Sequence, residues 1–216
     1  NPFTDLQLRL LREAVDALEA EGLRPPVVHA ANSAAGIDRP DARLDMVRAG
    51  IVVYGLDPSP ELAGRQPLLP ALSLLSQVSH VQELPAGEAI SYGRRHVVER
   101  DTVVATIPIG YADGVPRALS QVGGSVLIRG RRRPMVGVVT MDQVMVDCGP
   151  VGDVSEGDDV VLIGYQGDEY IGAAEWAAML GTIPYEIVCG IGPRVPRVYV
   201  GGPARFDPLP GERRAG

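Results

Sequence analysis

Two patterns of hydrophobic residues divide this chain. Near its start, apolar residues recur at helical spacing along one face: Leu6, Leu10, Leu11, Ala14, Val15 and Leu18. Thr4 and Gln7 match a capping box, and Gly22 stands where a C-cap glycine belongs, so a helix is predicted between them. Continuous apolar runs follow at residues 25–33 and 48–55. Two such runs joined by a short connection are typical of parallel strands in β/α structure.

After this segment the pattern changes to many short strands separated by turn residues. A proline-rich stretch, residues 58–70, is interpreted as a linker. Beyond it, strands are expected within residues 72–84, 102–109, 124–129, 134–147 and 159–163, and one helix over 173–180 ended by Gly181. The predicted fold class is therefore α/β plus mainly-β: residues 1–57 as the end of a β/α structure, 71–202 as an antiparallel β domain and 203–216 as a tail.

Composition excludes some classes of function but does not identify one. The net charge of -7 gives a nucleic-acid partner no electrostatic support. No apolar run approaches the roughly 20 residues of a membrane helix, so no membrane contact and a cytoplasmic location are expected. Cys148 and Cys189 are read as small buried hydrophobes, with no metal site. The arginines at 129 and 131–133 are expected in an exposed hairpin turn.

Candidate chemistry gathers at the ends of the two predicted parallel strands. Asn32-Ser33 and Gly50-Ile51 stand where strand-end loops of β/α barrels commonly hold a phosphate. An ordinary strand-end loop explains the same residues. For Arg48, spacing alone favours a salt bridge with Asp45 or Asp41.

Seven motifs then occur in the order found in one enzyme family, and the chain resembles alanine racemase. They are His29 to Ser33, Asp45 to Ile51 with Tyr54-Gly55, Ser91-Tyr92-Gly93, Ile109 to Gly114 with Arg117, Met141-Asp142-Gln143, Ile183 to Glu186, and Arg194 to Tyr199. The resemblance implies the terminal strands of a TIM-type β/α barrel followed by a C-terminal antiparallel β domain. It also implies pyridoxal phosphate (PLP) as cofactor, and a homodimer whose active sites are shared between subunits.

The implied activity is interconversion of L-alanine and D-alanine, the latter a peptidoglycan precursor. Tyr111 is implied as one catalytic base in contact with substrate, because a phenol can serve as a base where a cationic partner favours its ionised form. The other base in this family is the lysine that holds PLP as a Schiff base. All 20 Lys+Arg residues here are arginine. We therefore expect that the lysine-bearing N-terminal barrel portion is missing and that this chain alone is inactive.

The remaining roles follow from the same resemblance. Arg48 faces the pyridine nitrogen of PLP, and a donor-only guanidinium keeps that nitrogen unprotonated. The residues implied to hold the cofactor phosphate are Ser33, Gly50, Ile51 and Tyr185, with Asn32 beside them. The backbone N–H of Met141 is implied to meet the substrate carboxylate. An access corridor is implied for Asp142, Ile183 and His29, although a structural role suits His29 equally.

One departure and two alternatives stay open. Several members of the family carry an arginine where this chain has Val138, which bears on corridor charge and substrate tolerance. The enzyme could accordingly act on serine or on a broad range of amino acids. A different class of protein, a non-catalytic truncated homologue that acts as a binding or dimerisation module, also fits the missing lysine.

Overall fold

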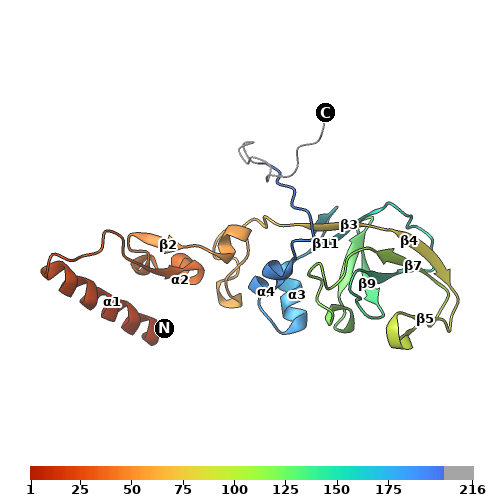
Figure 1. Ribbon diagram of the computed structural model, residues 1–216, viewed down its shortest axis with the longest axis horizontal. Helices are drawn as coiled ribbons and strands as arrows, with labels where there is room; N and C mark the ends of the chain where they lie inside the picture. The colour runs from red at the N-terminus through yellow and green to blue at the C-terminus, as the bar shows by residue number, and fades with distance from the viewer. Residues whose placement is uncertain (202–216) are drawn as a thin grey trace.

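The computed structural model describes residues 1–201, so the predicted tail at 203–216 lies outside the described residues. The molecule is elongated, with the N-terminal helix at one end and a β domain at the other (Figure 1). Within residues 1–201, no helix is long and apolar enough to cross a membrane.

The N-terminal part is a short β/α segment, called the barrel part below because it was predicted as the end of a β/α barrel. Its elements are α1 (Pro2–Ala20), β1 (His29–Asn32), α2 (Ser33–Asp38), η1 (Pro40–Ala42), β2 (Met46–Arg48) and η2 (Ile51–Tyr54). Strands β1 and β2 pair in parallel. The second apolar run is not a strand, which corrects the prediction: β2 ends at Arg48, and Ile51–Tyr54 forms a 3-10 helix closed by Gly55 at φ 72°. A short apolar run fits either element, so periodicity alone could not decide.

Helix α1 differs from its prediction at its start and on its buried face. Asn1 is the N-cap, and its side chain accepts a hydrogen bond from the Phe3 N–H, so Thr4 lies inside the helix. Gly22 has the predicted role: it adopts φ 69°, and the Gly22 and Leu23 N–H groups bond back to Glu19 and Leu18 in a Schellman motif. The buried residue is Leu8, which packs with Ala31 and Ala42, whereas Leu6, Leu10 and Leu18 are exposed.

The segment predicted as a linker folds back on itself. It contains η3 (Pro60–Leu62), whose Leu62 side chain is buried. At its ends the Ala71 N–H donates to the Tyr54 carbonyl at 3.0 Å. A β-carbon at Gly55 would overlap the Leu69 backbone, so a glycine is required where the two ends of the loop meet.

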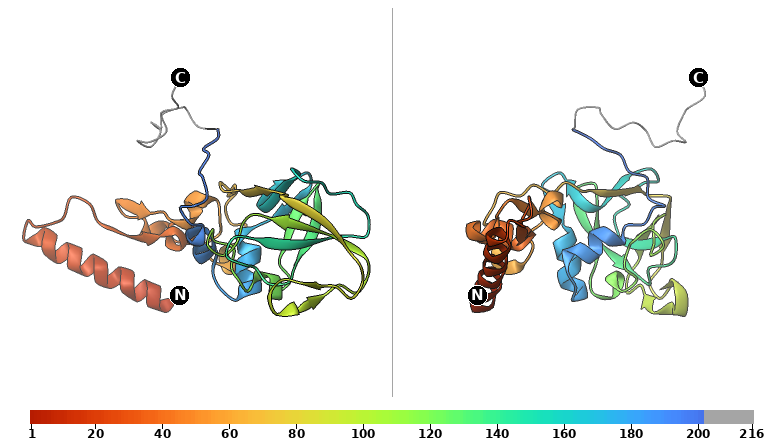
Figure 2. Two further views of the ribbon diagram at one scale, coloured as in Figure 1. Left: turned by 45° about the vertical axis from the view of Figure 1, so that its right-hand side comes forward. Right: turned by 60° about the vertical axis from the view of Figure 1, so that its left-hand side comes forward.

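The C-terminal part is built on one curved antiparallel sheet (Figure 2). Its strands lie in the order β12-β11-β8-β9-β10-β7-β4, with β3 also paired to β11. Only two residues separate β3 from β4, yet β4 lies at one end of this order and β3 pairs with β11 near the other, so the sheet curls toward a barrel. The strands are β3 (Leu74–Gln77), β4 (His80–Leu84), β7 (Thr102–Ile107), β8 (Ser125–Ile128), β9 (Arg131–Val136), β10 (Val144–Gly149), β11 (Asp159–Gln166) and β12 (Glu169–Ile171).

Smaller elements complete this part. A two-stranded sheet joins β5 (Ala89–Ile90) to β6 (His96–Val97), with η4 (Tyr92–Arg94) between them, and η5 (Leu119–Gln121) precedes β8. Helix α3 (Ala173–Leu180) has its predicted bounds and ends at Gly181 in the left-handed conformation. Helix α4 (Pro184–Gly190) was not predicted. The sheet and α3 enclose the main core, in which Trp176 and Leu127 are buried, and Ile51 of the barrel part joins it.

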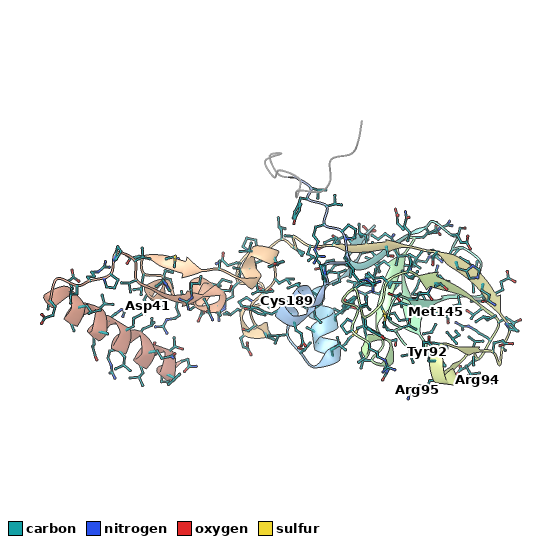
Figure 3. The ribbon with its side chains drawn as sticks, in the orientation of Figure 1. Asp41, Tyr92, Arg94, Arg95, Met145 and Cys189 are labelled. Atoms are coloured by element: carbon teal, nitrogen blue, oxygen red, sulfur yellow. The ribbon has the colours of Figure 1, made fainter. Side chains whose placement is uncertain are left out.

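The two cysteines have different environments. Cys148 is buried, as predicted, and burial raises the pKa of its thiol to about 11. Cys189 is exposed on α4, near the junction between the two parts (Figure 3), which corrects the prediction. Its apolar neighbours, Ile187 and Val188, face the core instead, because a helix buries only one side.

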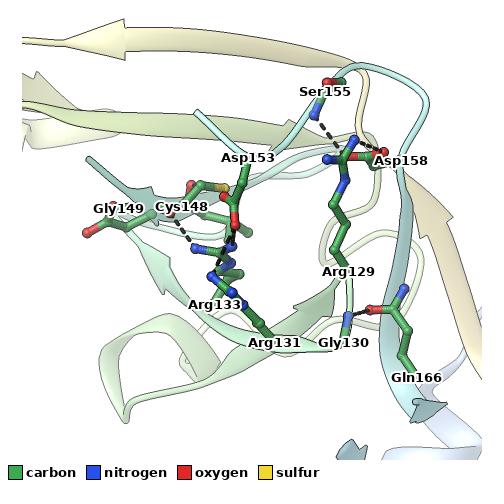
Figure 4. Close-up of polar contacts among 12 residues, drawn as sticks. Arg129, Gly130, Arg131, Arg133, Cys148, Gly149, Asp153, Ser155, Asp158 and Gln166 are labelled. Atoms are coloured by element: carbon green, nitrogen blue, oxygen red, sulfur yellow. Dashed lines mark hydrogen bonds and ion pairs between the residues drawn. The ribbon is translucent and has the colours of Figure 1, made fainter. Parts of the chain in front are cut away.

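The arginine cluster lies on the β8–β9 hairpin, but it is not simply exposed (Figure 4). The two-residue turn has Arg129 at φ 53° and Gly130 at φ 70°, the pattern of a type I′ turn. Arg133 is 9% exposed; it donates to the Cys148 carbonyl and pairs with Asp153 at 2.7 Å. The expectation of an exposed turn is therefore wrong for Arg133, because its carboxylate partner lies on another loop.

Candidate active site

The parallel pairing of β1 with β2 places their ends side by side. Asn32 is paired with Arg48 in this register; Ser33 follows Asn32 directly, and Gly50 follows Arg48 after one residue. The Gly50 N–H donates to the Ser33 hydroxyl at 2.9 Å, and Ser33 is buried. The Asn32 side chain caps α2 by accepting from the Ala35 N–H at 3.0 Å. The structure thus brings together four of the predicted residues and gives the Asn32 side chain a structural partner.

Arg48 contacts a histidine rather than a carboxylate. Its Nη1 atom lies 2.7 Å from His29 Nδ1. Because a guanidinium only donates, His29 Nδ1 is the acceptor in this contact. The salt bridge that spacing favoured is not formed. Asp45 instead accepts from the Val28 N–H, which holds the pKa of this carboxyl below its usual value, and Asp41 pairs with Arg39.

Ile51 and Tyr185 meet the same core from different elements. Ile51 opens η2, and its side chain is 2% exposed in the main core. Tyr185 lies in the first turn of α4 and packs against that core while remaining partly accessible. Gly50, the N-cap residue of η2, has no side chain that could cap the Ile51 N–H.

A second group of residues lies on two loops of the β domain. The loop after β7 carries Tyr111, which is 43% exposed, and the loop before β10 carries Met141. Backbone hydrogen bonds hold the two loops together: the Tyr111 N–H donates to the Thr140 carbonyl and the Ala112 N–H to the Met141 carbonyl, both at 3.0 Å. Gly110 permits this approach, because a β-carbon there would overlap both carbonyl groups.

Tyr111 and Met141 thus have fixed backbones and accessible side chains. The Met141 side chain is 52% exposed, and within residues 1–201 its N–H donates to no protein acceptor. Beside Tyr111 lies a surface hollow of about 360 Å³, which Thr182 and Glu186 also line. Ile183, the N-cap residue of α4, is exposed.

Sequence reasoning missed the ionic contacts around these two loops. Asp113 is buried; it accepts from the Gly110 N–H at 2.9 Å and pairs with Arg194 at 3.1 Å. Arg194 also reaches Asp142 at 2.6 Å. The motif Arg194 to Tyr199 contains nothing that indicates partners so distant in sequence.

The first group of residues and the second remain separate in this chain. Among the hydrogen bonds and ion pairs of residues 1–201, none joins Ser33, Arg48 or Gly50 to the Tyr111 or Met141 loops. The described side chains also contain no cluster of three or more potential metal ligands.

Comparison with known proteins gives one family throughout. The model of the alanine racemase C-terminal domain matches residues 71–199, and that of the N-terminal domain matches residues 1–58. The alanine racemase of Symbiobacterium thermophilum is 53% identical over 201 residues, which are 93% of this chain and 53% of the relative. That of Halothermothrix orenii is 46% identical over 197 residues, 91% of this chain and 52% of the relative.

Solved structures agree. The Bacillus anthracis alanine racemase with bound L-Ala-P superposes with a TM-score of 0.86 at 43% identity, covering 93% of this chain and 51% of that one. The Streptomyces coelicolor A3(2) enzyme gives 0.86 at 41% identity, covering 94% and 53%. The chain spans about half the length of the curated relatives it matches. It belongs to the alanine racemase family and comprises an antiparallel β domain with part of the barrel that precedes it.

Proposed function

We propose that this chain is the C-terminal part of a PLP-dependent alanine racemase that interconverts L-alanine and D-alanine in the cytoplasm. The observation that carries the proposal is the pair of joined loops, one carrying the exposed Tyr111 phenol and the other the Met141 N–H, which has no protein acceptor within residues 1–201. Racemisation needs a base at the α-carbon and a donor that fixes the carboxylate. Two loops held together by backbone hydrogen bonds supply both.

The residues at the strand ends fit the proposed cofactor. Ser33 accepts from the Gly50 N–H, so its own hydroxyl proton remains available for a phosphate oxygen. The uncapped start of η2 adds the Ile51 N–H, and Tyr185 on α4 adds a phenol. When bound, PLP withdraws electrons from the α-carbon of the substrate and so acidifies its proton.

Arg48 sets the electronic character of that ring. It donates only and faces no carboxylate among the described residues, so it is free to donate to a pyridine nitrogen. An unprotonated nitrogen weakens the ring as an electron sink, which favours return of the proton to carbon over side reactions. The contact with His29 orients the guanidinium, and we assign His29 this orienting role in addition to the predicted place in the corridor.

Tyr111 takes or returns the α-proton on one face, and inversion requires a second base on the other face. The chain contains no lysine, so the lysine of the family's mechanism must come from elsewhere in the protein. The separation of the strand-end residues from the Tyr111 loop supports a homodimer in which each site combines the two groups from different subunits. Asp142 and Ile183, both exposed, are proposed to line the access corridor.

The test uses the whole enzyme, in which this sequence is joined to the lysine-bearing barrel portion, supplied if necessary by the Symbiobacterium thermophilum relative. Tyr111→Phe should lower kcat by about 10²–10⁴-fold, as expected for a lost acid–base group, while the absorbance of bound PLP persists. Tyr165→Phe is the matched control, since Tyr165 is also exposed and its ring contacts that of Tyr170, away from both loops.

Two results would contradict the proposal. Racemisation by Tyr111→Phe at the parental rate would remove Tyr111 from the mechanism. A folded parent enzyme that binds PLP but racemises no amino acid would favour the binding module. Parallel assays with alanine and serine distinguish an alanine racemase from an enzyme of broader specificity. Broader specificity is the alternative suggested by Val138, which stands where several family members carry an arginine.

A further inference from the structure

Helix α4 ends against another backbone segment, with no side chain between the two. Gly114 of that segment adopts φ 113°, which L side chains rarely occupy. A β-carbon on Gly114 would lie 2.5 Å from the Gly190 carbonyl oxygen and 2.7 Å from the Ile191 α-carbon. Beside this contact, the Gly192 N–H donates to the Asp113 carbonyl at 3.0 Å. We call this contact the α4 joint; its centre has no room for a β-carbon.

The turn Gly110–Gly114 is the more firmly held side of the α4 joint. Two of its N–H groups, those of Tyr111 and Ala112, donate to carbonyl groups of the loop before β10 at 3.0 Å. The Val115 N–H closes the turn by donating to the Gly110 carbonyl at 3.1 Å, and the Val115 side chain is fully buried in the main core. A β-carbon at the joint therefore displaces α4 more readily than it displaces the turn.

Helix α4 is held less tightly toward its N-terminal end. Its N-cap residue, Ile183, makes no side-chain hydrogen bond to the helix, and Pro184 follows at the first helical position. The surface hollow of about 360 Å³ lies between this side of α4 and the turn, lined by Thr182 and Glu186 on one side and by Tyr111 on the other. The N-terminal half of α4 thus has space to move when its C-terminal end is pushed.

Tyr185 lies in that N-terminal half. Helix α4 is at the end of the β domain that faces the barrel part (Figure 1), and Tyr185 packs against the same core as Ile51. With seven residues, α4 is about 10 Å long and moves as a unit, because its backbone hydrogen bonds join successive turns. The Gly190 carbonyl must withdraw by roughly 0.5 Å before a β-carbon on Gly114 reaches 3.0 Å, the lower limit for real β-carbons. That shift would lengthen a phenol–phosphate hydrogen bond from about 2.7 Å to about 3.2 Å, beyond its normal range.

We propose that Gly114 is a positioning residue for the cofactor: by leaving the α4 joint free of a side chain, it lets α4 hold the Tyr185 phenol at hydrogen-bonding distance from the phosphate of PLP. This inference rests on the proposed function and adds to it a residue that touches neither cofactor nor substrate. The property it predicts is cofactor affinity, which is measured without turnover.

The test measures the apparent Kd of PLP for the whole enzyme after removal of its cofactor. Gly123→Ala is the matched control for Gly114→Ala, because Gly123 also has a positive φ, 88°, but a β-carbon there meets nothing within 4 Å. Tyr185→Phe removes a hydrogen bond to a charged group and should raise the Kd by about 10–10²-fold. Gly114→Ala only lengthens that bond and should raise the Kd by about 3–30-fold, whereas Gly123→Ala should stay near the parent.

Two further measurements separate a lost phosphate contact from a general loss of structure. Pyridoxal lacks the phosphate, so Gly114→Ala should bind pyridoxal about as well as the parent does while binding PLP more weakly. The double variant with Tyr185→Phe completes a thermodynamic cycle. Because Gly114→Ala acts through the Tyr185 phenol, it should change the Kd of PLP little once that phenol is absent.

The proposal is overturned if Gly114→Ala matches Gly123→Ala in the Kd of PLP, weakens PLP and pyridoxal by equal factors, or has its full effect in the Tyr185→Phe background. Should Gly114→Ala fail to fold, Gly192→Ala presses on the same joint more gently, since its β-carbon would lie 3.2 Å from the Ala112 carbonyl oxygen. It should give the same pattern at smaller size, and equal weakening of both ligands there also overturns the proposal. A parent enzyme that binds no PLP would instead contradict the proposed function, so the two failures are distinguishable.

Discussion

Gly110 is the position where one added methyl group should separate the two loops of the proposed site. A β-carbon on Gly110 would lie 2.5 Å from the Met141 carbonyl carbon and would also overlap the Met141 and Thr140 oxygens. All three are backbone atoms, which cannot rotate away as a side chain can. The Gly110→Ala variant must therefore displace the Met141 loop or the turn that carries Tyr111.

The size of this displacement follows from the contact. The Met141 carbonyl must withdraw by roughly 0.5 Å or more before the distance reaches 3.0 Å, the lower limit for real β-carbons. Overpacking of this kind typically costs about 1–3 kcal/mol, which corresponds to a fall in Tm of roughly 2–12 °C for a chain of this size. A shift of about 0.5–1 Å between base and carboxylate donor should lower kcat by about 10–10²-fold.

Two other glycines make the experiment a graded series. Gly192→Ala meets the Ala112 carbonyl oxygen at 3.2 Å, a tight contact that a small adjustment relieves, and Gly152→Ala meets no atom within 4 Å. The Tm and the kcat should therefore decrease from Gly152→Ala to Gly192→Ala to Gly110→Ala. Both values for Gly152→Ala should lie near those of the parent. Parental kcat in Gly110→Ala, or an equal loss in Gly152→Ala, would refute the argument from close backbone approach.

The two thiols should differ in reactivity, because burial raises the pKa of Cys148 to about 11 whereas Cys189 is exposed. One thiol should react with a thiol reagent in the native protein at mildly alkaline pH and two after denaturation; fast native reaction of Cys148 would contradict its burial. The bidentate hydrogen bond from Arg39 lowers the pKa of Asp41 from 3.8 to about 2 in the folded state. Its stabilising effect should be complete above pH 4 and lost as pH falls toward 2, so the Tm difference between the parent and Asp41→Asn should disappear over that interval, and a constant difference would refute the assignment.

The parts of the fold that are determined by residues close together in the sequence were predictable. Gly181 ends α3 because a left-handed residue is needed there, and the alternation in Val144 to Asp147 follows the two faces of β10. The predictions were wrong where contacts between residues distant in the sequence determine which side chain is buried. Arg133 is buried because Asp153 lies on another loop, and Leu8 is the buried residue of α1 because Ala31 and Ala42 cover that side.

The candidate site shows the same division. Motif order predicted roles for Tyr111, Met141 and the strand-end residues, and among the described residues no hydrogen bond or ion pair joins the strand-end residues to the two loops. The Arg194 bridge could not be predicted, since Asp142 lies 52 positions away in sequence and the motif around Arg194 contains no acidic residue. Only the folded backbone brings the three segments together.

The loop between the two parts of the molecule has a consequence for chain length. Tyr54 and Ala71 are hydrogen-bonded to each other, so the path of residues 55–70 leaves and returns at one place. Residues 63–67 are exposed, and a β-carbon on Gly64 would touch nothing within 4 Å. Adding or removing residues there changes mainly the loop-closure entropy, by about 0.6 kcal/mol for each doubling of length. The length of this segment can therefore differ between homologues without changing the distance between the barrel part and the β domain.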